Sequence, residues 1–279
     1  MLKNTIIAFI NHLLINKIPY SLSQKKYIFK MANIIEFLDL GRIDYHKAWD
    51  LQTQLLKLSS DTKQKNKNLS ETERIKPRHY FLTCEHPHVY TLGRNGKEEH
   101  LLADEEKLDA IGAEFVKINR GGDITYHGLG QLVGYPILDL DEFFTDIAKY
   151  IRFIEEVMIR MLAEYDIKGE RIAGESGVWI DAQVPGRARK ICAIGVHLSR
   201  WITMHGFALN VNTDLSYFSH IVPCGIVDKS VTSMQMELGR ELNVAEVREK
   251  VGKHFAALFE AELKNIVLED LPVTMSVEL

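Results

Sequence analysis

A glycine-rich polar segment from Arg120 to Gln131 is the first place in this sequence where chemistry could be done. It reads Arg-Gly-Gly-Asp-Ile-Thr-Tyr-His-Gly-Leu-Gly-Gln. Glycines let backbone N–H groups approach a ligand closely, and Arg120 could bind a phosphate or a carbonyl through a charge-assisted hydrogen bond. The segment has neither the GxxxxGK[ST] pattern of a P-loop nor the strand–loop–helix setting of a dinucleotide fingerprint. These residues fit a binding loop and a tight turn before a strand equally well.

Cys224 is a candidate nucleophile, because its neighbours in Pro223-Cys224-Gly225 predict an exposed, tight turn. A thiol there needs a base or a lowered pKa to attack at neutral pH. Cys84 and Cys192 lie in apolar runs, where buried structural cysteines are common, and Cys224 could also be structural. Three cysteines at long spacings form no disulfide framework and indicate a reducing compartment, the cytoplasm.

Lys190 stands directly before the apolar run Ile191–Gly195. A lysine that opens a strand is most often an edge residue that faces water. Partly desolvated beside a thiol, the same lysine would favour the thiolate and could then move protons. Both interpretations stay open on the residues alone.

Histidines offer a weaker hint of a metal site. Cys84, His86 and His88 alternate along one run, so their side chains could point the same way. No further ligand follows at a matching spacing, and we expect no metal. Three other histidines are too scattered to be assembled from the sequence: His79, His127 and His205.

The elements that must position these residues follow from apolar periodicity. The expected strands are residues 34–40, 79–84, 89–92, 114–118, 131–138, 177–181, 190–198 and 205–212. We expect Pro136 to break the strand 131–138. The expected helices are residues 44–58, 143–165 and 244–264, and residues 59–77 are expected to form an exposed loop or a frayed helix end. Because strands and helices mix without a sustained βαβ rhythm, we predict an α+β fold: a single domain with a mixed β-sheet flanked by helices.

Length, composition and charge exclude several classes of protein. A chain of 279 residues with 46% hydrophobic residues is not disordered, and its net charge of −4 argues against a nucleic-acid coat. Residues 1–30 carry five lysines and no acid, which leaves −9 on residues 31–279. The apolar run near the start is too short and too polar to span a membrane, and no cleavage site follows it. We expect residues 1–30 to be a dispensable basic extension, with a peripheral anchor helix as the alternative.

Three long segments resemble the lipoyl(octanoyl) transferase family, in the same order and at compatible spacing. They are EHPHVYTLGRNGKEEHLL, RGGDITYHGLGQLVGYPILDL and KICAIGVHLSRWITMHGFALNVNTDLSYFSHIVPCGI, within a resemblance that runs from about Leu38 to about Met236. The downstream Pro-Cys-Gly distinguishes these transferases from the related ATP-using lipoate and biotin ligases. The resemblance implies that residues 31–279 form a catalytic domain with the fold of the biotin and lipoate ligases.

The resemblance also implies a reaction, the first step of protein lipoylation. An octanoyl group would pass from octanoyl-acyl carrier protein to a lysine of a lipoyl domain through a cysteine thioester, with no cofactor. Cys224 matches the family's nucleophile, and Lys190 matches the lysine that lowers the cysteine pKa and handles protons. The acceptors would be the lipoyl domains of 2-oxoacid dehydrogenases and the glycine cleavage H protein. Neither nucleic acid nor a membrane is expected as a partner.

Three stretches match the family's substrate-binding segments. They are Arg120, Gly121, Gly122, Asp123, Ile124, Thr125, Tyr126 and His127; then Ala193, Ile194 and Gly195; then Gly206, Phe207 and Ala208. We expect Tyr90, Ile194 and Phe207 to line a tunnel for the apolar tail. The sequence departs from the family at Leu129, in the place of a usual proline, and at His88, where a proline is common. Leu129 loosens the loop and could alter the shape of the acyl pocket.

Docking of the protein partners needs local positive charge, because acyl carrier proteins and lipoyl domains are usually acidic. Arg187, Arg189 and Lys190 are close in the sequence, with Arg94 and Arg120 as candidate neighbours in space, although a solvated hairpin tip would explain residues 186–189 equally simply.

Two other functions fit the same fold. One is an ATP-dependent lipoate or biotin ligase, for which Cys224 would be incidental. The other is a non-catalytic acyl-domain binder, against which the presence of both Lys190 and Cys224 argues.

Overall fold

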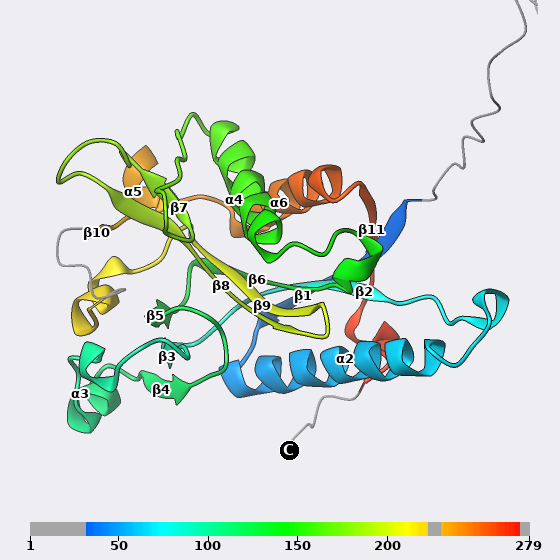
Figure 1. Cartoon of the computed structure of the whole chain (residues 1–279). Helices are drawn as coiled ribbons and strands as arrows, with labels where there is room; N and C mark the ends of the chain where they lie inside the picture. The colour runs from blue at the N-terminus through cyan, green and yellow to red at the C-terminus, as the bar shows by residue number, and fades with distance from the viewer. Residues whose placement is uncertain (1–31, 223–229, 274–279) are drawn as a thin grey trace, which may run out of the picture. The chain divides into compact units, whose positions relative to one another are not determined.

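The computed structural model describes residues 32–222 and 230–273, which belong to one compact unit that begins at Ala32 (Figure 1). The predicted extension of residues 1–30 and the Pro223-Cys224-Gly225 turn lie outside these ranges. The described part of the chain contains an eight-stranded main sheet in the order β10-β8-β9-β6-β2-β1-β11, with β7 beside β8. Its strands are β1 (Asn33–Arg42), β2 (His79–Glu85), β6 (Gln131–Ile137), β7 (Val178–Ile180), β8 (Arg189–Ser199), β9 (Ile202–Asn210), β10 (Ser230–Val231) and β11 (Ala261–Asn265).

The main sheet is mixed, as predicted. Strands β2, β6, β9 and β8 form antiparallel pairs, whereas β1 pairs in parallel with both β2 and β11. Strand β10 pairs in parallel with β8 at the other end of the sheet. The central strands β2, β6 and β9 are buried along nearly their whole length, which explains their almost continuous apolar sequences.

Helices cover both faces of the main sheet (Figure 1). Helix α2 (Tyr45–Asn66) packs on one face against β6 and β9. Helices α4 (Ile147–Ala163) and α6 (Val244–Leu258) pack together on the other face, over a core that includes Phe81, Phe207 and Leu209. The short helix α5 (Met234–Leu238) follows β10. Among the described residues, no helix combines the length and apolar character that crossing a bilayer requires.

A smaller sheet, in the order β4-β3-β5, carries the glycine-rich segment. It consists of β3 (Val89–Leu92), β4 (Glu114–Lys117) and β5 (Ile124–His127). Its own core contains Tyr90, Ile124 and Tyr126, closed by the short helix α3 (Glu105–Ala110) and the 3₁₀ turn η4 (Leu215–His220). The loop between β4 and β5 is therefore held by a compact unit rather than by a flexible connection.

Three differences from the predictions go beyond shifts of a few residues at the ends of elements. Helix α2 continues to Asn66, so the polar segment after residue 58 is helical for two further turns. The expected helix 244–264 ends at Leu258, and residues 261–265 form β11, which pairs with β1. Pro136 does not break the strand 131–138, because it lies beyond Gly134, the last residue of β6 in register with β9.

Candidate active site

A cavity of about 530 Å³ opens where the glycine-rich loop meets β8 and β9. Thirteen of the fourteen predicted binding residues line it: Arg120, Gly121, Gly122, Asp123, Ile124, Thr125, His127, Ala193, Ile194, Gly195, Gly206, Phe207 and Ala208. Lys190 lines the same cavity. The structure thus brings together residues that lie far apart in the sequence.

Tyr126 is the predicted binding residue that does not line the cavity. Its side chain is fully buried in the core of the small sheet, where its hydroxyl lies 2.7 Å from Nδ1 of His88 and its ring stacks on Tyr217. The alternation of side chains along β5 turns Tyr126 away from its neighbours Thr125 and His127. Tyr126 therefore anchors the glycine-rich segment in the core of the small sheet instead of facing the cavity.

The second and third binding stretches are cross-strand partners. In the antiparallel pair of β8 and β9, Ala193 lies opposite Ala208, Ile194 opposite Phe207, and Gly195 opposite Gly206. Alanine and glycine pairs on one face of the sheet leave room that larger side chains would fill. This register explains why two short motifs, separated in the sequence, both contain small residues at alternate positions.

The glycine-rich loop lies directly on this strand pair. A Cβ atom at Gly195 would be 2.9 Å from the carbonyl oxygen of Gly121, and the amide of Gly121 donates a hydrogen bond to the carbonyl of Val196 at 2.9 Å. Gly122 has a φ of +90°, which favours glycine. The close approach of loop and strand is thus possible because β8 carries glycine at position 195.

Arg120 holds the loop in place from the buried side. Its Nη2 donates to the carbonyl and to Oγ1 of Thr91 on β3, at 2.6 and 3.0 Å, and its Nη1 donates to the carbonyl of Gly121 at 3.1 Å. The side chain also lines the cavity. Arg120 therefore acts at least in part as an anchor of the binding loop.

Asp123 links the loop to a segment that sequence reasoning missed. One of its carboxylate oxygens lies 2.6 Å from Nδ1 of His100, and the other accepts the amide of Ile124. The carbonyl of His100 accepts the amide of Val222, two positions before Cys224 in the sequence. The only signal for His100 was its place within the first family-like segment, residues 85–102.

A chain of buried amides crosses the site from His127 to Lys190. Nδ1 of His127 lies 2.9 Å from Oε1 of Gln131, whose Nε2 donates to Oδ1 of Asn210. Asn210 donates to the carbonyl of Thr232, and the amide of Thr232 donates to the carbonyl of Lys190. The network therefore fixes the backbone of Lys190 and of the residue that follows β10.

The histidines of the site are neutral at ordinary pH. Burial, with His86 nearby, lowers the pKa of His127 to about 3, and burial beside Arg120 lowers the pKa of His205 to about 3. Because Gln131 uses its amide nitrogen to donate, its oxygen accepts, and the proton of His127 is on Nδ1. Neither histidine is placed to act as a base at pH 7.

Lys190 does not face water as a strand-edge lysine would. It is partly buried, and its Nζ lies 4.5 Å from the centre of the Trp179 ring on the neighbouring strand β7. An ammonium over an indole face is attracted by the electrons of the ring. Cys224, the predicted nucleophile, lies outside the described residues, so only the lysine of the predicted pair is placed in the cavity.

The Cys84, His86 and His88 run does not converge. Nε2 of His86 lies 2.7 Å from the hydroxyl of Tyr135 and 3.4 Å from Sγ of Cys84, whereas His88 stacks on Tyr217 in the small sheet's core. No group of three His, Cys, Asp or Glu side chains in residues 32–222 and 230–273 could hold a metal ion. Cys84 and Cys192 are free and buried, and burial raises the pKa of both thiols.

One further expectation needs correction, and another stays a prediction. Ile194 and Phe207 line the cavity, but Tyr90 does not, because it packs in the small sheet's core and donates to the carbonyl of Tyr217. Leu129, expected to affect the shape of the acyl pocket, is 37% exposed and is not among the residues that line the cavity.

The expected basic patch is reduced in the structure. Arg120 is buried, and Arg189 forms ion pairs with Asp181 at 2.6 Å and Glu237 at 2.7 Å. Lys190 lines the cavity, which leaves Arg94 and Arg187 as the exposed members of the group. Arg187 itself lies 3.2 Å from Asp181.

Comparison with known proteins places this geometry in a family. Residues 44–256 match the family described as the lipoyl protein ligase A/B catalytic domain. The octanoyltransferase of Christiangramia forsetii is 59% identical over 235 residues, which cover 84% of this chain and 99% of the relative. The octanoyltransferase of Cytophaga hutchinsonii is 56% identical over 227 residues, which cover 81% and 93%.

Solved structures share the fold at low sequence identity. A bipartite lipoate protein ligase from Thermoplasma acidophilum superposes with a TM-score of 0.60 at 15% identity, covering 86% of this chain and 88% of the other. A lipoate-protein ligase A with bound ATP gives a TM-score of 0.60 at 14% identity, covering 86% and 90%. These matches confirm the predicted ligase-like fold. The family match and the relatives above establish that this chain belongs to the octanoyltransferases of the lipoyl protein ligase A/B catalytic domain family.

Proposed function

We propose that this protein transfers an octanoyl group from octanoyl-acyl carrier protein to a lysine of a lipoyl domain, through a thioester on Cys224. The supporting observation is the single cavity that Lys190 shares with residues of all three predicted binding stretches. Ile151, Ile194 and Phe207 give it apolar walls. Burying the tail of an octanoyl group would contribute about 5 kcal/mol, at ~0.8 kcal/mol for each CH₂.

The first half of the reaction forms the acyl-enzyme. Lys190 takes the proton of the Cys224 thiol on its Nζ, and the thiolate attacks the carbonyl carbon of the octanoyl thioester. As the new carbon–sulfur bond forms and the tetrahedral intermediate collapses, the bond to the phosphopantetheine sulfur breaks. That sulfur takes the proton back from Lys190 and leaves as a thiol.

The second half transfers the acyl group to nitrogen. The neutral amine of the acceptor lysine attacks the carbonyl carbon of the Cys224 thioester, and the carbon–sulfur bond breaks. Lys190 accepts a proton from the attacking nitrogen and passes it to the Cys224 sulfur, which restores the free thiol. Lys190 is the base in this scheme because His127 and His205 are held neutral, with pKa values too low for that role at pH 7.

The partners follow from the same scheme. We propose octanoyl-acyl carrier protein as the donor and the lipoyl domains of 2-oxoacid dehydrogenases and the glycine cleavage H protein as acceptors. The protein would work in the cytoplasm without a cofactor. Of the basic residues considered for docking, Arg94 and Arg187 are the exposed ones.

Intact-mass measurement after incubation with octanoyl-acyl carrier protein tests the proposal. We expect the gain of one octanoyl group in the wild type and in Cys84→Ala, and no gain in Cys224→Ala. Cys84 is a matched control because it is a free cysteine that is buried away from the cavity. Octanoylation of a lipoyl domain that requires free octanoate and ATP would instead identify a ligase. Donor binding without an adduct would identify a non-catalytic binder.

A further inference from the structure

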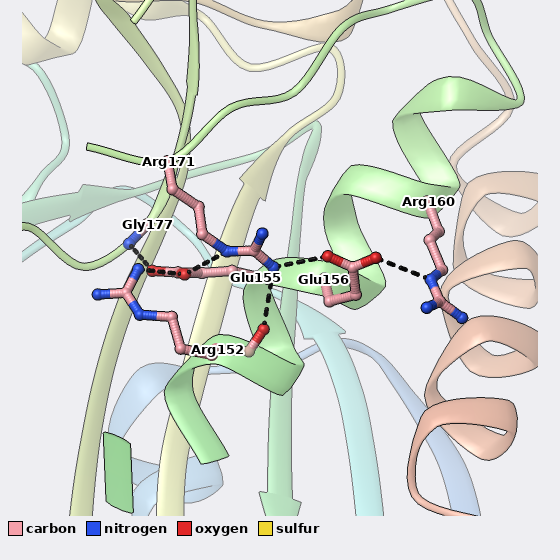
Figure 2. Close-up of polar contacts among 6 residues, drawn as sticks. All are labelled: Arg152, Glu155, Glu156, Arg160, Arg171 and Gly177. Atoms are coloured by element: carbon pink, nitrogen blue, oxygen red, sulfur yellow. Dashed lines mark hydrogen bonds and ion pairs between the residues drawn. The ribbon is translucent and has the colours of Figure 1, made fainter. Parts of the chain in front are cut away.

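Glu155 is a fully buried carboxylate that the proposed reaction does not use. It projects from α4 and accepts three hydrogen bonds: from Nη1 of Arg152 at 2.5 Å, from Nε of Arg171 at 2.9 Å and from the backbone amide of Gly177 at 3.1 Å (Figure 2). Burying a charge is costly unless it is paired and hydrogen-bonded, as this one is.

What Glu155 holds is the segment that enters β7. Gly177 has a φ of +119°, and a Cβ atom there would lie 2.6 Å from the carbonyl oxygen of Cys192 on β8. The same Cβ would lie 3.5 Å from Cε of Lys190. The backbone at Gly177 therefore packs against the hydrocarbon stem of Lys190, with no side chain between them.

The next residues of the same segment reach the amine. Trp179 is the cross-strand partner of Lys190 in the pair of β7 and β8, and its ring lies 4.5 Å from Nζ. Gly177 and Trp179 thus contact the stem and the head of one lysine. A shift of this segment would move both contacts together.

We propose that Glu155 is a positioning residue for Lys190, acting through the backbone of Gly177. The inference rests on the proposed role of Lys190 in proton transfer. The carboxylate fixes the segment from Gly177 to Trp179 against α4, and that segment fixes the lysine in the cavity. Arg152 and Arg171 pair with the buried carboxylate and orient it.

Other charged groups among the described residues lie in the same corner. Glu175 lines the cavity with Lys190, whereas Arg189, the next residue along β8, turns to Asp181 and Glu237. Cys192 is buried, and Glu155 raises the pKa of its thiol in addition to the larger effect of burial.

Glu156 provides a matched control on the same helix. It also accepts a hydrogen bond from Arg171, at 2.7 Å, and pairs with Arg160, but Glu155 is the carboxylate that binds Gly177 (Figure 2). Gly174 provides a second control. Its φ of +83° resembles that of Gly177, but a Cβ atom there would meet nothing within 4 Å.

The experiment compares Glu155→Gln with Glu156→Gln and Gly177→Ala with Gly174→Ala. Two quantities are measured: kcat and KM for transfer from octanoyl-acyl carrier protein, and the pH midpoint of Cys224 alkylation. Cys224→Ala supplies the background from the two buried thiols. We expect Glu155→Gln and Gly177→Ala to lower kcat at least about tenfold with little change in KM, because proton transfer contributes roughly 10²–10⁴-fold. We also expect their alkylation midpoints to rise toward about 8.5, the value of a free thiol.

The two control variants should keep the wild-type kcat and midpoint. Circular dichroism shows which variants fold. If Glu155→Gln does not fold, Gly177→Ala still tests whether the segment that Glu155 holds positions Lys190, because this variant keeps the buried carboxylate. Wild-type kcat and midpoint in a folded Glu155→Gln or Gly177→Ala would overturn the inference. Wild-type values in Lys190→Met would instead refute the proposed role of the lysine, so the two failures are distinguishable.

Discussion

Replacing Gly195 by alanine should separate loop docking from the chemistry. The added Cβ would lie 2.9 Å from the carbonyl oxygen of Gly121 and 3.0 Å from Cδ of Arg120. The first contact is with backbone, so either the glycine-rich loop or β8 must move. Gly121 itself is the matched control, because a Cβ atom there would meet its nearest neighbour, the carbonyl of Val196, at an ordinary 3.4 Å.

The size of the effect follows from the cost of overpacking. Extra atoms in a well-packed site typically cost about 1–3 kcal/mol. If the loop leaves its docked position to relieve the clash, its docking equilibrium weakens by roughly 5- to 150-fold. Because the loop forms one wall of the cavity, KM for the acyl donor should rise by a factor in that range. The free energy of unfolding should fall by about the same 1–3 kcal/mol.

Steady-state transfer with octanoyl-acyl carrier protein measures KM, and urea unfolding measures stability. Gly121→Ala should stay close to the wild type in stability, because its added Cβ meets no tight contact. If Gly195→Ala also kept the wild-type KM and stability, the loop would not be packed on β8 as described, and the explanation for the paired small residues of β8 and β9 would fail.

Three further predictions concern the base, the buried histidines and the first residues of the chain. Lys190→Met should lower transfer roughly 10²–10⁴-fold while circular dichroism stays that of the wild type, and near-native turnover would remove the lysine from the mechanism. Acid should destabilise the fold because four buried histidines have depressed pKa values, about 4 for two of them and about 3 for the others: His79, His86, His127 and His205. Each binds a proton more readily in the unfolded chain, whose histidine pKa is about 6.5, so stability is full above that pH and is lost as the pH falls towards 4 or 3. Between pH 6.5 and pH 5 each histidine should cost about 2 kcal/mol, and urea unfolding of His127→Gln should show a smaller loss than the wild type. Deleting residues 1–30 should leave transfer intact, and an inactive truncated protein would show that the extension is needed.

The periodicity of apolar residues along the sequence predicted most of the helices and strands. Strands β2, β3, β6 and β9 stand out as apolar runs, and α4 as a helix, because burial of these elements requires apolar residues at a fixed period. The strand at Ala261–Asn265 was missed because only alternate residues of this edge strand are partly buried, and its pairing with β1 joins opposite ends of the described chain. The extension of α2 to Asn66 was missed because its polar last turns bury little apolar surface.

The sequence by itself determined which residues are the candidates for the chemistry: a lysine before a strand, a cysteine between proline and glycine, and three stretches rich in small residues. Only the tertiary structure decided how they are arranged. It placed Lys190 in the cavity rather than at an exposed edge, turned Tyr126 away, and brought His100 to Asp123 and Glu155 to the amide of Gly177. The physical reason is that the sequence gives residue types directly, and the tight turns that they favour depend on residues next to them in the chain. Its burial and hydrogen-bond partners depend on strand register and helix packing across the whole domain.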